Sequence, residues 1–524
     1  MSLTGRLIIG FERVSTTETF RAVDPAEGGP LPGEFSVAGR AEVDRACALA
    51  ASSFDALRQS SLNLRASFLD SCAANLLALG DELLLRAAEE TGLPRARLEG
   101  ERARTAGQLR LFAAEVRRGD WLTLRIDPAQ PERKPLPRAD LRMRKVPLGP
   151  VAVFGASNFP LAFSAAGGDV AAALAAGCPV IVKAHPSHPG TSELAATAVS
   201  EAARECGLPG GTYSHLSGPS NDLGRALVTH PAIKAVGFTG SRAGGLALLR
   251  LAAGRAEPIP VYAEMSSVNP VIILPGALRA RAQAIAAGFV KSLTLGAGQF
   301  CTNPGLVLAI AGPELDRFTG AAAAALSKSA PDQMLSPGIS ANYRRGVERL
   351  EQHARVSQIA RGVAGKGCEA RGALFEVPAR EFIASLDLSE EVFGPSSLLV
   401  VCDGVPELRA VVDALSGQLT ATLQLDDTDH AAAAELLPVL ETKVGRIVVN
   451  GWPTGVEVCH AMVHGGPFPA TSDSRTTSVG TLAIERFLRP VCYQDMPHEL
   501  LPPELRDAAR TFRRLVDGEP EVSP

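Results

Sequence analysis

Apolar residues follow two different spacings along the chain, and the first of them fills its amino-terminal part. From Glu42 to about Gly119 they recur every three or four residues, as in Val43, Cys47 and Ala50. This spacing places them on one face of a helix. The pattern therefore predicts a helical layer over this part of the chain.

Short apolar runs alternate with helical stretches farther along. Strands are predicted at residues 151–154, 180–182 and 235–238, and helices at 167–176 and 192–206. Such alternation is typical of parallel strands joined by crossover helices.

A second series of apolar runs predicts another unit of the same kind. Its strands are expected at residues 271–274, 306–308, 397–401 and 446–449. The segment from Pro128 to Pro147 is rich in proline, lysine and arginine, which disfavours a helix and predicts an extended connector. The fold class predicted from the pattern is α/β, with two units.

Length and charge narrow the kinds of partner. The chain has 524 residues, with 52 basic and 56 acidic side chains and a net charge of −4. At roughly 150 residues per domain, this length suits about three domains. A near-neutral charge gives no electrostatic reason to bind nucleic acid or an anionic membrane surface. We therefore expect a small molecule as the partner.

Cysteine spacing, apolar stretches and the amino terminus bear on the cellular setting. The nine cysteines are scattered and never spaced Cys-x-x-Cys, which argues against disulfide frameworks and zinc ribbons. The most apolar stretch, residues 151–182, is interrupted by Asn158, Pro160 and Asp169, so no membrane span is predicted. Met1–Gly10 lacks the pattern of a secretory signal, and we expect a cytoplasmic protein.

One cysteine lies in a loop of small and polar residues. Gly296-Ala-Gly298-Gln-Phe-Cys301 supplies the first two glycines of the common dinucleotide fingerprint but has cysteine in place of the third, so that match fails. A cysteine in such a turn is open to a substrate and to backbone donors. From this loop alone, Cys301 is either a reactive thiol or a buried inert one.

A thiol nucleophile requires an oxyanion donor and, for hydrolysis, a base. Asn158 follows a predicted strand and is a candidate donor, although asparagine in such a turn is often conformational. Glu264 lies in a weakly charged strand-to-turn region and is a candidate base, with an ion pair or a helix cap as the alternative.

Six short motifs together resemble the aldehyde dehydrogenase superfamily, in its order and at its approximate spacing, from about Phe20 to Pro490. They are Ser157-Asn-Phe-Pro160, Val182-Lys183, Gly237-Phe-Thr-Gly-Ser241 followed by Gly245, Glu264 before Asn269-Pro270, Gly298-Gln-Phe-Cys301, and Glu391-Val-Phe-Gly-Pro395. The resemblance implies an aldehyde dehydrogenase fold with a Rossmann-like coenzyme domain, an α/β catalytic domain and an extended oligomerisation arm.

The resemblance also implies domain boundaries and an assembly. The coenzyme domain would span residues 1–130 and 150–265, and the catalytic domain residues 266–470. The arm would comprise residues 131–149 and 471–490, followed by a carboxyl-terminal extension, 491–524. Exposed extended strands tend to pair between subunits, so we expect a homodimer or a homotetramer.

The same resemblance assigns the chemistry. Cys301 would attack the aldehyde, and Asn158 and the Cys301 backbone N–H would hold the oxyanion. After hydride transfer to a nicotinamide cofactor, Glu264 would activate the water that hydrolyses the thioester. The coenzyme A-acylating branch typically lacks a base here, so Glu264 favours hydrolysis to a carboxylic acid.

Cofactor residues follow from the resemblance as well. Gly240, Ser241 and Gly245 would open a helix that receives the pyrophosphate. Lys183 would contact the adenine-side ribose, Glu391 the nicotinamide ribose, and Phe393 would pack beside the ring.

The residues after Lys183 bear on the choice of cofactor. Pro186 stands where NAD-preferring relatives carry an acid, and Ser187 can bond a 2′-phosphate, so we expect NADP, with NAD as the alternative. The pair His185/His188 is interrupted by proline and lacks acidic partners, so no metal is expected.

Finer motifs resemble the α-ketoglutarate semialdehyde (2,5-dioxopentanoate) dehydrogenase branch and its neighbours, the NADP-dependent fatty aldehyde dehydrogenases. They are Tyr262-Ala-Glu-Met-Ser-Ser-Val-Asn-Pro270, Lys183-Ala-His-Pro-Ser-His-Pro189 and Arg475-Thr-Thr-Ser-Val-Gly480. The substrate would then carry a remote carboxylate, for which Arg475 is a candidate anchor or, alternatively, a solvated surface residue. The alternatives are a medium- or long-chain aldehyde dehydrogenase, a coenzyme A-acylating enzyme, and a non-catalytic relic that binds or supports other molecules.

Overall fold

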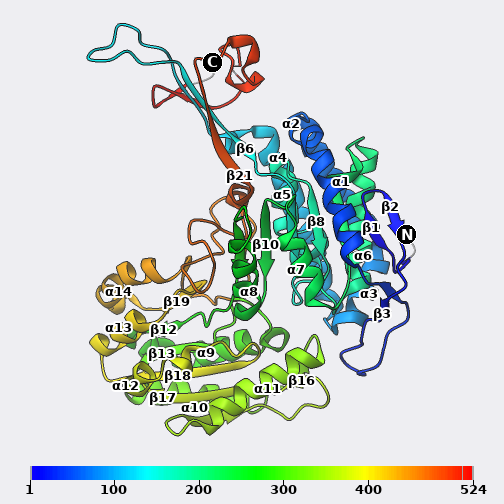
Figure 1. Ribbon diagram of the computed structural model, residues 1–524. Helices are drawn as coiled ribbons and strands as arrows, with labels where there is room; N and C mark the ends of the chain where they lie inside the picture. The colour runs from blue at the N-terminus through cyan, green and yellow to red at the C-terminus, as the bar shows by residue number, and fades with distance from the viewer. Residues whose placement is uncertain (1–2, 510, 522–524) are drawn as a thin grey trace.

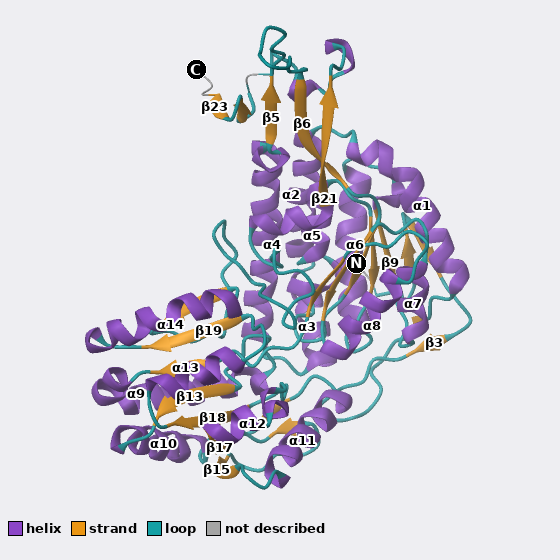
Figure 2. Ribbon diagram, turned by 60° about the vertical axis from the view of Figure 1, so that its left-hand side comes forward, coloured by secondary structure: helices purple, strands orange, loops and turns teal. Residues whose placement is uncertain are grey.

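The computed structural model describes residues 3–509 and 511–521 of the chain. Two seven-stranded sheets, each covered by helices, make up most of the molecule, and a smaller sheet projects from them (Figure 1, Figure 2). The α/β fold class predicted from the sequence is confirmed. None of the described helices is both long and apolar enough to cross a membrane.

The first sheet is built from strands whose apolar residues are buried. Five of its strands run parallel, and two amino-terminal strands are added antiparallel at one edge. Its order is β11 (Val261–Glu264), β10 (Ala235–Thr239), β7 (Val151–Phe154), β8 (Val180–Lys183), β9 (Tyr213–Leu216), β1 (Leu7–Ile9) and β2 (Glu12–Val14).

Helices cover both faces of this sheet, as parallel strands require. The predicted helical layer over residues 42–119 consists of four helices: α1 (Arg40–Arg58), α2 (Leu62–Ala78), α3 (Gly80–Thr91) and α4 (Arg95–Arg118). The crossover helices are α5 (Asp169–Ala176), α6 (Pro189–Glu205), α7 (Asn221–Thr229) and α8 (Arg242–Ala253). Every residue of α5 is buried, which explains its lack of polar residues apart from Asp169.

The second sheet has the same layered design. Its strands are parallel except β15, which pairs antiparallel at the edge. The order is β15 (Ser357–Arg361), β17 (Ala373–Pro378), β18 (Ser396–Cys402), β13 (Leu306–Ile310), β12 (Val271–Ile273), β19 (Thr420–Gln424) and β20 (Arg446–Val449). The helices are α9 (Pro275–Thr294), α10 (Pro313–Leu326), α11 (Pro337–Gln352), α12 (Ala379–Ala384), α13 (Val405–Ala414) and α14 (His430–Lys443).

A five-stranded sheet forms the projecting arm at the top of Figure 2. Its order is β21 (Leu488–Gln494), β6 (Leu141–Pro147), β5 (Leu124–Asp127), β22 (Arg514–Val516) and β23 (Glu519–Glu521). Two pairs of short strands complete the described elements: β3 (Thr19–Phe20) with β4 (Phe35–Ser36), and β14 (Asp332–Gln333) with β16 (Glu369–Ala370).

The strands of the arm differ from the predicted segments at three places, the first being β5, which the prediction puts in the coenzyme domain (1–130). Residues 471–487, predicted to lie in the arm, instead contact the first sheet, where the Ser472 N–H donates to the Ala263 carbonyl over 2.9 Å. The predicted extension 491–524 supplies the end of β21 and both β22 and β23, while residues 522–524 lie outside the described part. Sequence pattern alone does not distinguish these polar segments, because sheet contacts between distant parts of the chain decide their places.

The ends of the parallel strands position the candidate residues. β8 ends at Lys183, β10 at Thr239 and β11 at Glu264, and the turn that contains Asn158 follows β7. Carboxyl ends of parallel strands meet at one edge of a sheet, so these side chains share that edge. Cys301 reaches the same place from the second unit, in the loop before β13.

Candidate active site

The loop that carries Cys301 is held by backbone contacts of two other segments. The Asn269 amide donates to the carbonyls of Cys301 and Asn303, each over 2.9 Å. Gly298 has φ +64°, and a Cβ on it would lie 2.4 Å from the carbonyl carbon of Gly394. Only glycine permits this approach of the two loops, so the sequence Gly298-Gln-Phe-Cys301 places a half-buried thiol at a fixed point.

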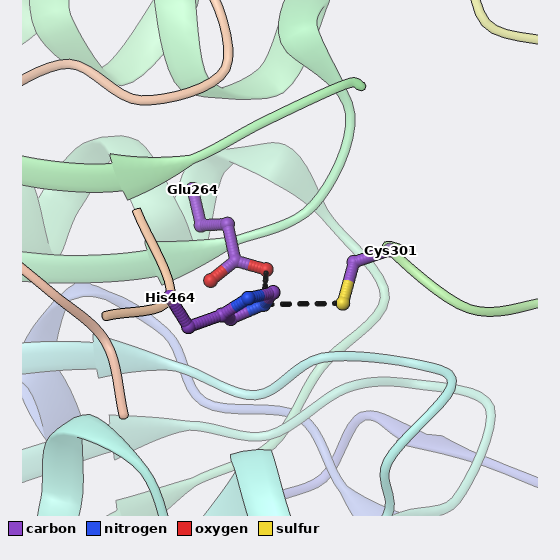
Figure 3. Close-up of side chains that lie close together, drawn as sticks. All are labelled: Glu264, Cys301 and His464. Atoms are coloured by element: carbon purple, nitrogen blue, oxygen red, sulfur yellow. Dashed lines mark hydrogen bonds and ion pairs between the residues drawn. The ribbon is translucent and has the colours of Figure 1, made fainter. Parts of the chain in front are cut away.

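A histidine lies between the thiol and the candidate base (Figure 3). The Cys301 Sγ is 3.2 Å from His464 Nε2, and the same nitrogen is 2.9 Å from Glu264 Oε1. The Ser478 hydroxyl donates to the other oxygen of Glu264 over 2.6 Å. Glu264 and His464 are both almost completely buried. His464 therefore holds the thiol and the carboxylate close to each other.

The tautomer of His464 follows from its two ring nitrogens. Nε2 meets the carboxylate, whereas Nδ1 is buried with no hydrogen-bond partner among the described residues. A proton on Nδ1 would be an unsatisfied buried donor, which is costly. The proton therefore lies on Nε2, which donates to the Glu264 carboxylate and positions it.

The pKa values of Cys301 and Glu264 shift in opposite directions. Burial raises the pKa of the Cys301 thiol well above its ordinary value, and the charges of Glu264 and Glu391 raise it further, while Arg104 lowers it. Burial also acts to raise the pKa of Glu264, but its interactions with His464 and the hydrogen bond from Ser478 outweigh burial and hold this pKa below its ordinary value. At neutral pH the site thus holds an ionised base and a protonated thiol.

Asn158 lies at the wall beside the nucleophile loop. Its amide donates to the Gln299 carbonyl over 3.1 Å, and Arg97 donates to the Asn158 carbonyl over 2.7 Å. A side-chain amide has two N–H donors, so this contact leaves one for a ligand.

A cavity of about 190 Å³ joins the candidate catalytic and cofactor residues. Its lining comprises Ser157, Asn158, Thr239, Gly240, Ser241, Glu264, Met265, Cys301, Ile339, Asn342, Glu391 and Phe393. Burial raises the pKa of Glu391 to about 7, and hydrogen bonds from the Ser266 side chain and the Ser267 backbone act against this shift. The structure therefore brings together all three predicted catalytic residues and four of the predicted cofactor residues.

Three predicted cofactor residues lie outside the lining of this cavity. Gly245 is within α8, where a Cβ would lie 2.6 Å from the Met265 sulfur. Lys183 ends β8, and burial lowers its pKa to about 8. Ser187 lies in the loop that follows, where its N–H donates to His185 Nδ1 over 3.2 Å.

The shape of this edge fits a dinucleotide. Helix α8 begins directly after Gly240 and Ser241, so its first N–H groups point toward the cavity edge. A Cβ on Gly240 would lie 2.7 Å from the ring of Phe238, so the position favours glycine. Because glycine has no side chain, a ligand can approach the backbone closely there. With Lys183 at the end of β8, two strands away in the same sheet, the residues present suit a phosphate-bearing cofactor.

The two histidines considered for a metal have other partners. His188 Nε2 is 2.8 Å from the Ala156 carbonyl, and the ring stacks on His185 with centroids 5.5 Å apart. In the described part of the chain, the donor atoms of Glu264, Cys301 and His464 do lie within 4.8 Å of one another. His464 Nε2 contacts both of the other two residues directly, over 3.2 Å to Cys301 Sγ and 2.9 Å to Glu264 Oε1.

Arg475 does not lie where a substrate anchor must lie. Its side chain is 85% exposed and forms an ion pair with Asp473 over 2.7 Å. Arg475 is therefore a solvated surface residue, which was the alternative to the predicted substrate anchor.

Sequence reasoning missed His464 and the role of Ser478. Both lie more than 150 residues beyond Cys301, in an irregular segment without periodic apolar residues. Residues 475–480 are one of the finer motifs of the sequence, in which only Arg475 was given a role, and Ser478 belongs to the same motif. A buried carboxylate such as Glu264 requires hydrogen-bond donors, and Ser478 is one of them.

Comparisons with known proteins agree with this geometry. A family model described as "Aldehyde dehydrogenase family" matches residues 12–467. The chain is 59% identical to "Alpha-ketoglutaric semialdehyde dehydrogenase 2" of Azospirillum brasilense, over 99% of this chain and 100% of that one. It is 49% identical to "Alpha-ketoglutaric semialdehyde dehydrogenase" of Acinetobacter baylyi, over 98% of each.

Solved structures share the fold. A crystal structure of 1-pyrroline-5-carboxylate dehydrogenase from Thermus with bound NAD matches with a TM-score of 0.77 and 22% sequence identity. The match covers 93% of this chain and 92% of that one. The two sheets and the arm thus form an architecture that accommodates a nicotinamide dinucleotide in that protein.

Proposed function

Because this chain belongs to the aldehyde dehydrogenase family, whose members use NAD or NADP, we propose that it oxidises α-ketoglutaric semialdehyde to 2-oxoglutarate with NADP. The observation that carries the chemistry is the meeting of Cys301, His464 and Glu264 at the cavity edge lined by Gly240 and Ser241. The two relatives of that name support the substrate.

The first step activates the thiol. The Cys301 proton passes to the Glu264 carboxylate, whose oxygen lies within 4.8 Å of the sulfur, while the His464 Nε2–H holds that carboxylate in place. The thiolate then attacks the aldehyde carbon and forms a thiohemiacetal. The Asn158 amide and the Cys301 backbone N–H stabilise its oxyanion, because fixed donors aimed at a developing charge lower the barrier. This proton transfer explains how a thiol whose pKa is raised by burial reacts at neutral pH.

Oxidation and hydrolysis complete the cycle. With a nicotinamide dinucleotide held by Gly240, Ser241, Glu391 and Phe393, the cofactor would supply the hydride acceptor that converts the thiohemiacetal into a thioester on Cys301. Glu264 loses its proton to solvent and then takes one from the attacking water. The tetrahedral adduct collapses, the Cys301 thiolate regains a proton from Glu264, and the acid leaves. The lowered pKa of Glu264 keeps this base ionised between cycles.

The preference for NADP rests on the residues after Lys183. Pro186 places no carboxylate beside the adenine ribose, and Ser187 is half-buried at the same loop. Without a negative charge there, a 2′-phosphate meets the Lys183 ammonium and a hydroxyl donor. We assign Glu391 to the nicotinamide ribose and Phe393 to the ring, since both line the cavity at Cys301.

The proposed assembly is a homodimer or a homotetramer. The arm projects from the first unit, and β21 is the outer strand of its sheet (Figure 1). An outer strand leaves backbone groups available for pairing with a second copy. Sedimentation at micromolar concentration should show dimers or tetramers, and monomers alone would contradict this assembly.

A steady-state panel tests the function. We expect NADPH formation with α-ketoglutaric semialdehyde at a kcat/KM at least about tenfold above that with hexanal, and above that with NAD in place of NADP. The Cys301→Ala protein serves as the inactive control. A requirement for coenzyme A, or an equal preference for hexanal, would contradict the proposal.

A further inference from the structure

Helix α4 presents a stripe of polar side chains to the turn that carries Asn158. Arg97, Glu101, Arg104 and Gln108 follow at spacings of four, three and four, which places them on one face of the helix. The facing segment is residues 158–168, so this stripe forms part of the wall beside Cys301.

Three members of the stripe bond to the backbone of that segment. Arg97 donates to the Asn158 carbonyl over 2.7 Å. Glu101 Oε1 accepts the N–H groups of Leu161 and Ala162 over 2.8 and 2.9 Å. Gln108 Oε1 accepts the Gly168 N–H over 3.0 Å, so each of the three has a structural use.

Arg104 is the exception. Its guanidinium lies over the Phe163 ring, 5.2 Å from the centroid, and forms no hydrogen bond or ion pair with any residue that the structure describes. The Nη1 nitrogen is buried and has no partner among those residues. A guanidinium has five N–H donors, and a buried donor without an acceptor is costly to keep. The aromatic contact occupies its face and leaves its edge free for a planar anion.

Arg104 also lines an open cavity beside α4. Residues of α4, Arg104 and Arg110 among them, line this space of about 670 Å³ together with Val456, Glu457 and Val458. The Arg104 charge lowers the pKa of the Cys301 thiol, so the guanidinium is close enough to act on the nucleophile. Arg104 therefore links this cavity to the surroundings of the thiol.

We propose that Arg104 binds the carboxylate that the substrate carries at the end remote from its aldehyde. The inference rests on the proposed function, because it supplies the anchor that an α-keto acid aldehyde requires. A carboxylate matches the fork of a guanidinium with two parallel hydrogen bonds, and it would satisfy the buried Nη1. Arg104 is then a specificity residue for aldehydes with a carboxylate at the far end.

Glu457 is the acidic residue of the same lining, and its position agrees with this role. It is exposed, and its Oε1 accepts the Val458 N–H over 3.1 Å. A charge at the open edge is screened by water, whereas the half-buried Arg104 is screened less. The cation on the inner side of this lining is therefore Arg104, on which the buried Glu101 carboxylate also acts.

The test compares a carboxylated and an uncharged aldehyde of equal length. For Arg104→Met, kcat/KM with α-ketoglutaric semialdehyde should fall by about 100-fold, chiefly through KM, and kcat/KM with pentanal should change by less than about threefold. Arg104→Lys should restore part of the loss with the semialdehyde. Arg110→Met, in the same helix and cavity but exposed, is the matched control and should leave both substrates within about threefold.

Two results would overturn the anchor. An equal loss with both aldehydes would mean that Arg104 supports the wall through Phe163. An unchanged KM for the semialdehyde would mean that another group binds the carboxylate. Thermal melting of the variants separates either result from misfolding.

A second measurement keeps the anchor separate from the proposed substrate. Glutarate, an unreactive dicarboxylate, should slow alkylation of Cys301 by iodoacetamide in the natural protein and not in Arg104→Met. If the natural protein shows no preference for the semialdehyde but glutarate protects it only when Arg104 is present, the proposed function fails and the anchor stands. Equal protection of both proteins would overturn the anchor.

Discussion

Two carboxyl groups, the buried Glu264 and the half-buried Glu391, face Cys301 from the two units, and their surroundings act on them in opposite ways. Glu264, at the end of β11 in the first sheet, interacts with His464 and Ser478, and its pKa lies below the ordinary value despite burial. Glu391, in the loop before β18 of the second sheet, has its pKa raised to about 7 by burial. The number and charge of the hydrogen-bond donors, rather than burial, decide which carboxyl serves as a base.

The difference divides the site into a region for chemistry and one for binding. Around Glu264 the polar groups bond to one another, so the base is held by fixed contacts. At Glu391 and Arg104 the polar groups have fewer protein partners, and a ligand can supply the missing ones. Preorganised catalysis and ligand recognition make opposite demands on hydrogen bonding.

Removing the base should have the largest effect. Glu264→Gln should lower steady-state turnover about 10³-fold, because thioester hydrolysis loses its general base. A first burst of NADPH, near one per active site, should remain but form more slowly, since Glu264 also accepts the thiol proton in the first step. Rapid mixing with absorbance at the NADPH band measures both. A burst at the natural rate would show that Glu264 takes no part in activating the thiol.

Removing His464 should have the next largest effect. His464→Gln should lower kcat/KM about 100-fold and slow alkylation of Cys301 by iodoacetamide at pH 7 about tenfold, because Glu264 loses the contact that positions it beside the thiol. His460→Gln is the matched control, since His460 is exposed and lies nearby in sequence. Alkylation at the natural rate in His464→Gln would remove His464 from thiol activation.

Glu391 should show a smaller effect that depends on pH. In the natural protein, NADP should bind more weakly as pH falls through about 7, where the Glu391 carboxylate gains a proton and loses its strength as an acceptor. Glu391→Gln should bind NADP about tenfold more weakly at pH 8 and with little pH dependence between 6 and 8. Fluorescence titration with NADPH measures this. A flat profile in the natural protein would separate Glu391 from cofactor binding.

The same residue predicts a change in stability with a fixed sign. A carboxyl whose pKa is higher in the folded state than in the unfolded state destabilises the fold as pH rises from about 4.5 toward 7. Glu391→Gln should therefore raise the melting temperature at pH 8 relative to the natural protein, and raise it less at pH 5. A gain that does not vary with pH would contradict the raised pKa.

Arg475 should show the smallest effect. The Arg475 side chain is exposed and pairs with Asp473 instead of lining the substrate cavity. Arg475→Ala should therefore change kcat/KM for the semialdehyde by less than about twofold. The matched comparison is Arg104→Met in the same assay. A large rise in KM for Arg475→Ala would restore it as a substrate anchor.

Much of the fold could be predicted because its signals are local. The helical spacing over residues 42–119 and the strands near Val151 and Val271 depend on neighbouring residues, and the structure has elements at each of them. The arm depends on pairing between residues more than 300 positions apart, as when β6 pairs with β21. No local pattern encodes such pairing, so the predicted segments and the observed strands differ there.

The candidate site divides in the same way. Cys301, Asn158 and Glu264 stand in recognisable motifs, and the structure brings them to one cavity. His464 and Arg104 act through three-dimensional contacts that no short motif contains. One lies in an irregular loop and the other on a long, arginine-rich helix where many charges face solvent. Their importance follows only from which polar atoms are paired and which are not.

The late position of residues 464–494 in the chain has a consequence for biosynthesis. The backbone of β11 beside Glu264 is completed by residues 470–472, and the Met265 N–H donates to the Ala470 carbonyl over 2.7 Å. A ribosome that has translated only as far as residue 460 has already made Cys301 and Glu264, but not the histidine and serine that join and tune them. The nascent chain therefore carries the Cys301 thiol without these partners. The complete site forms only when the final tenth of the chain is being translated.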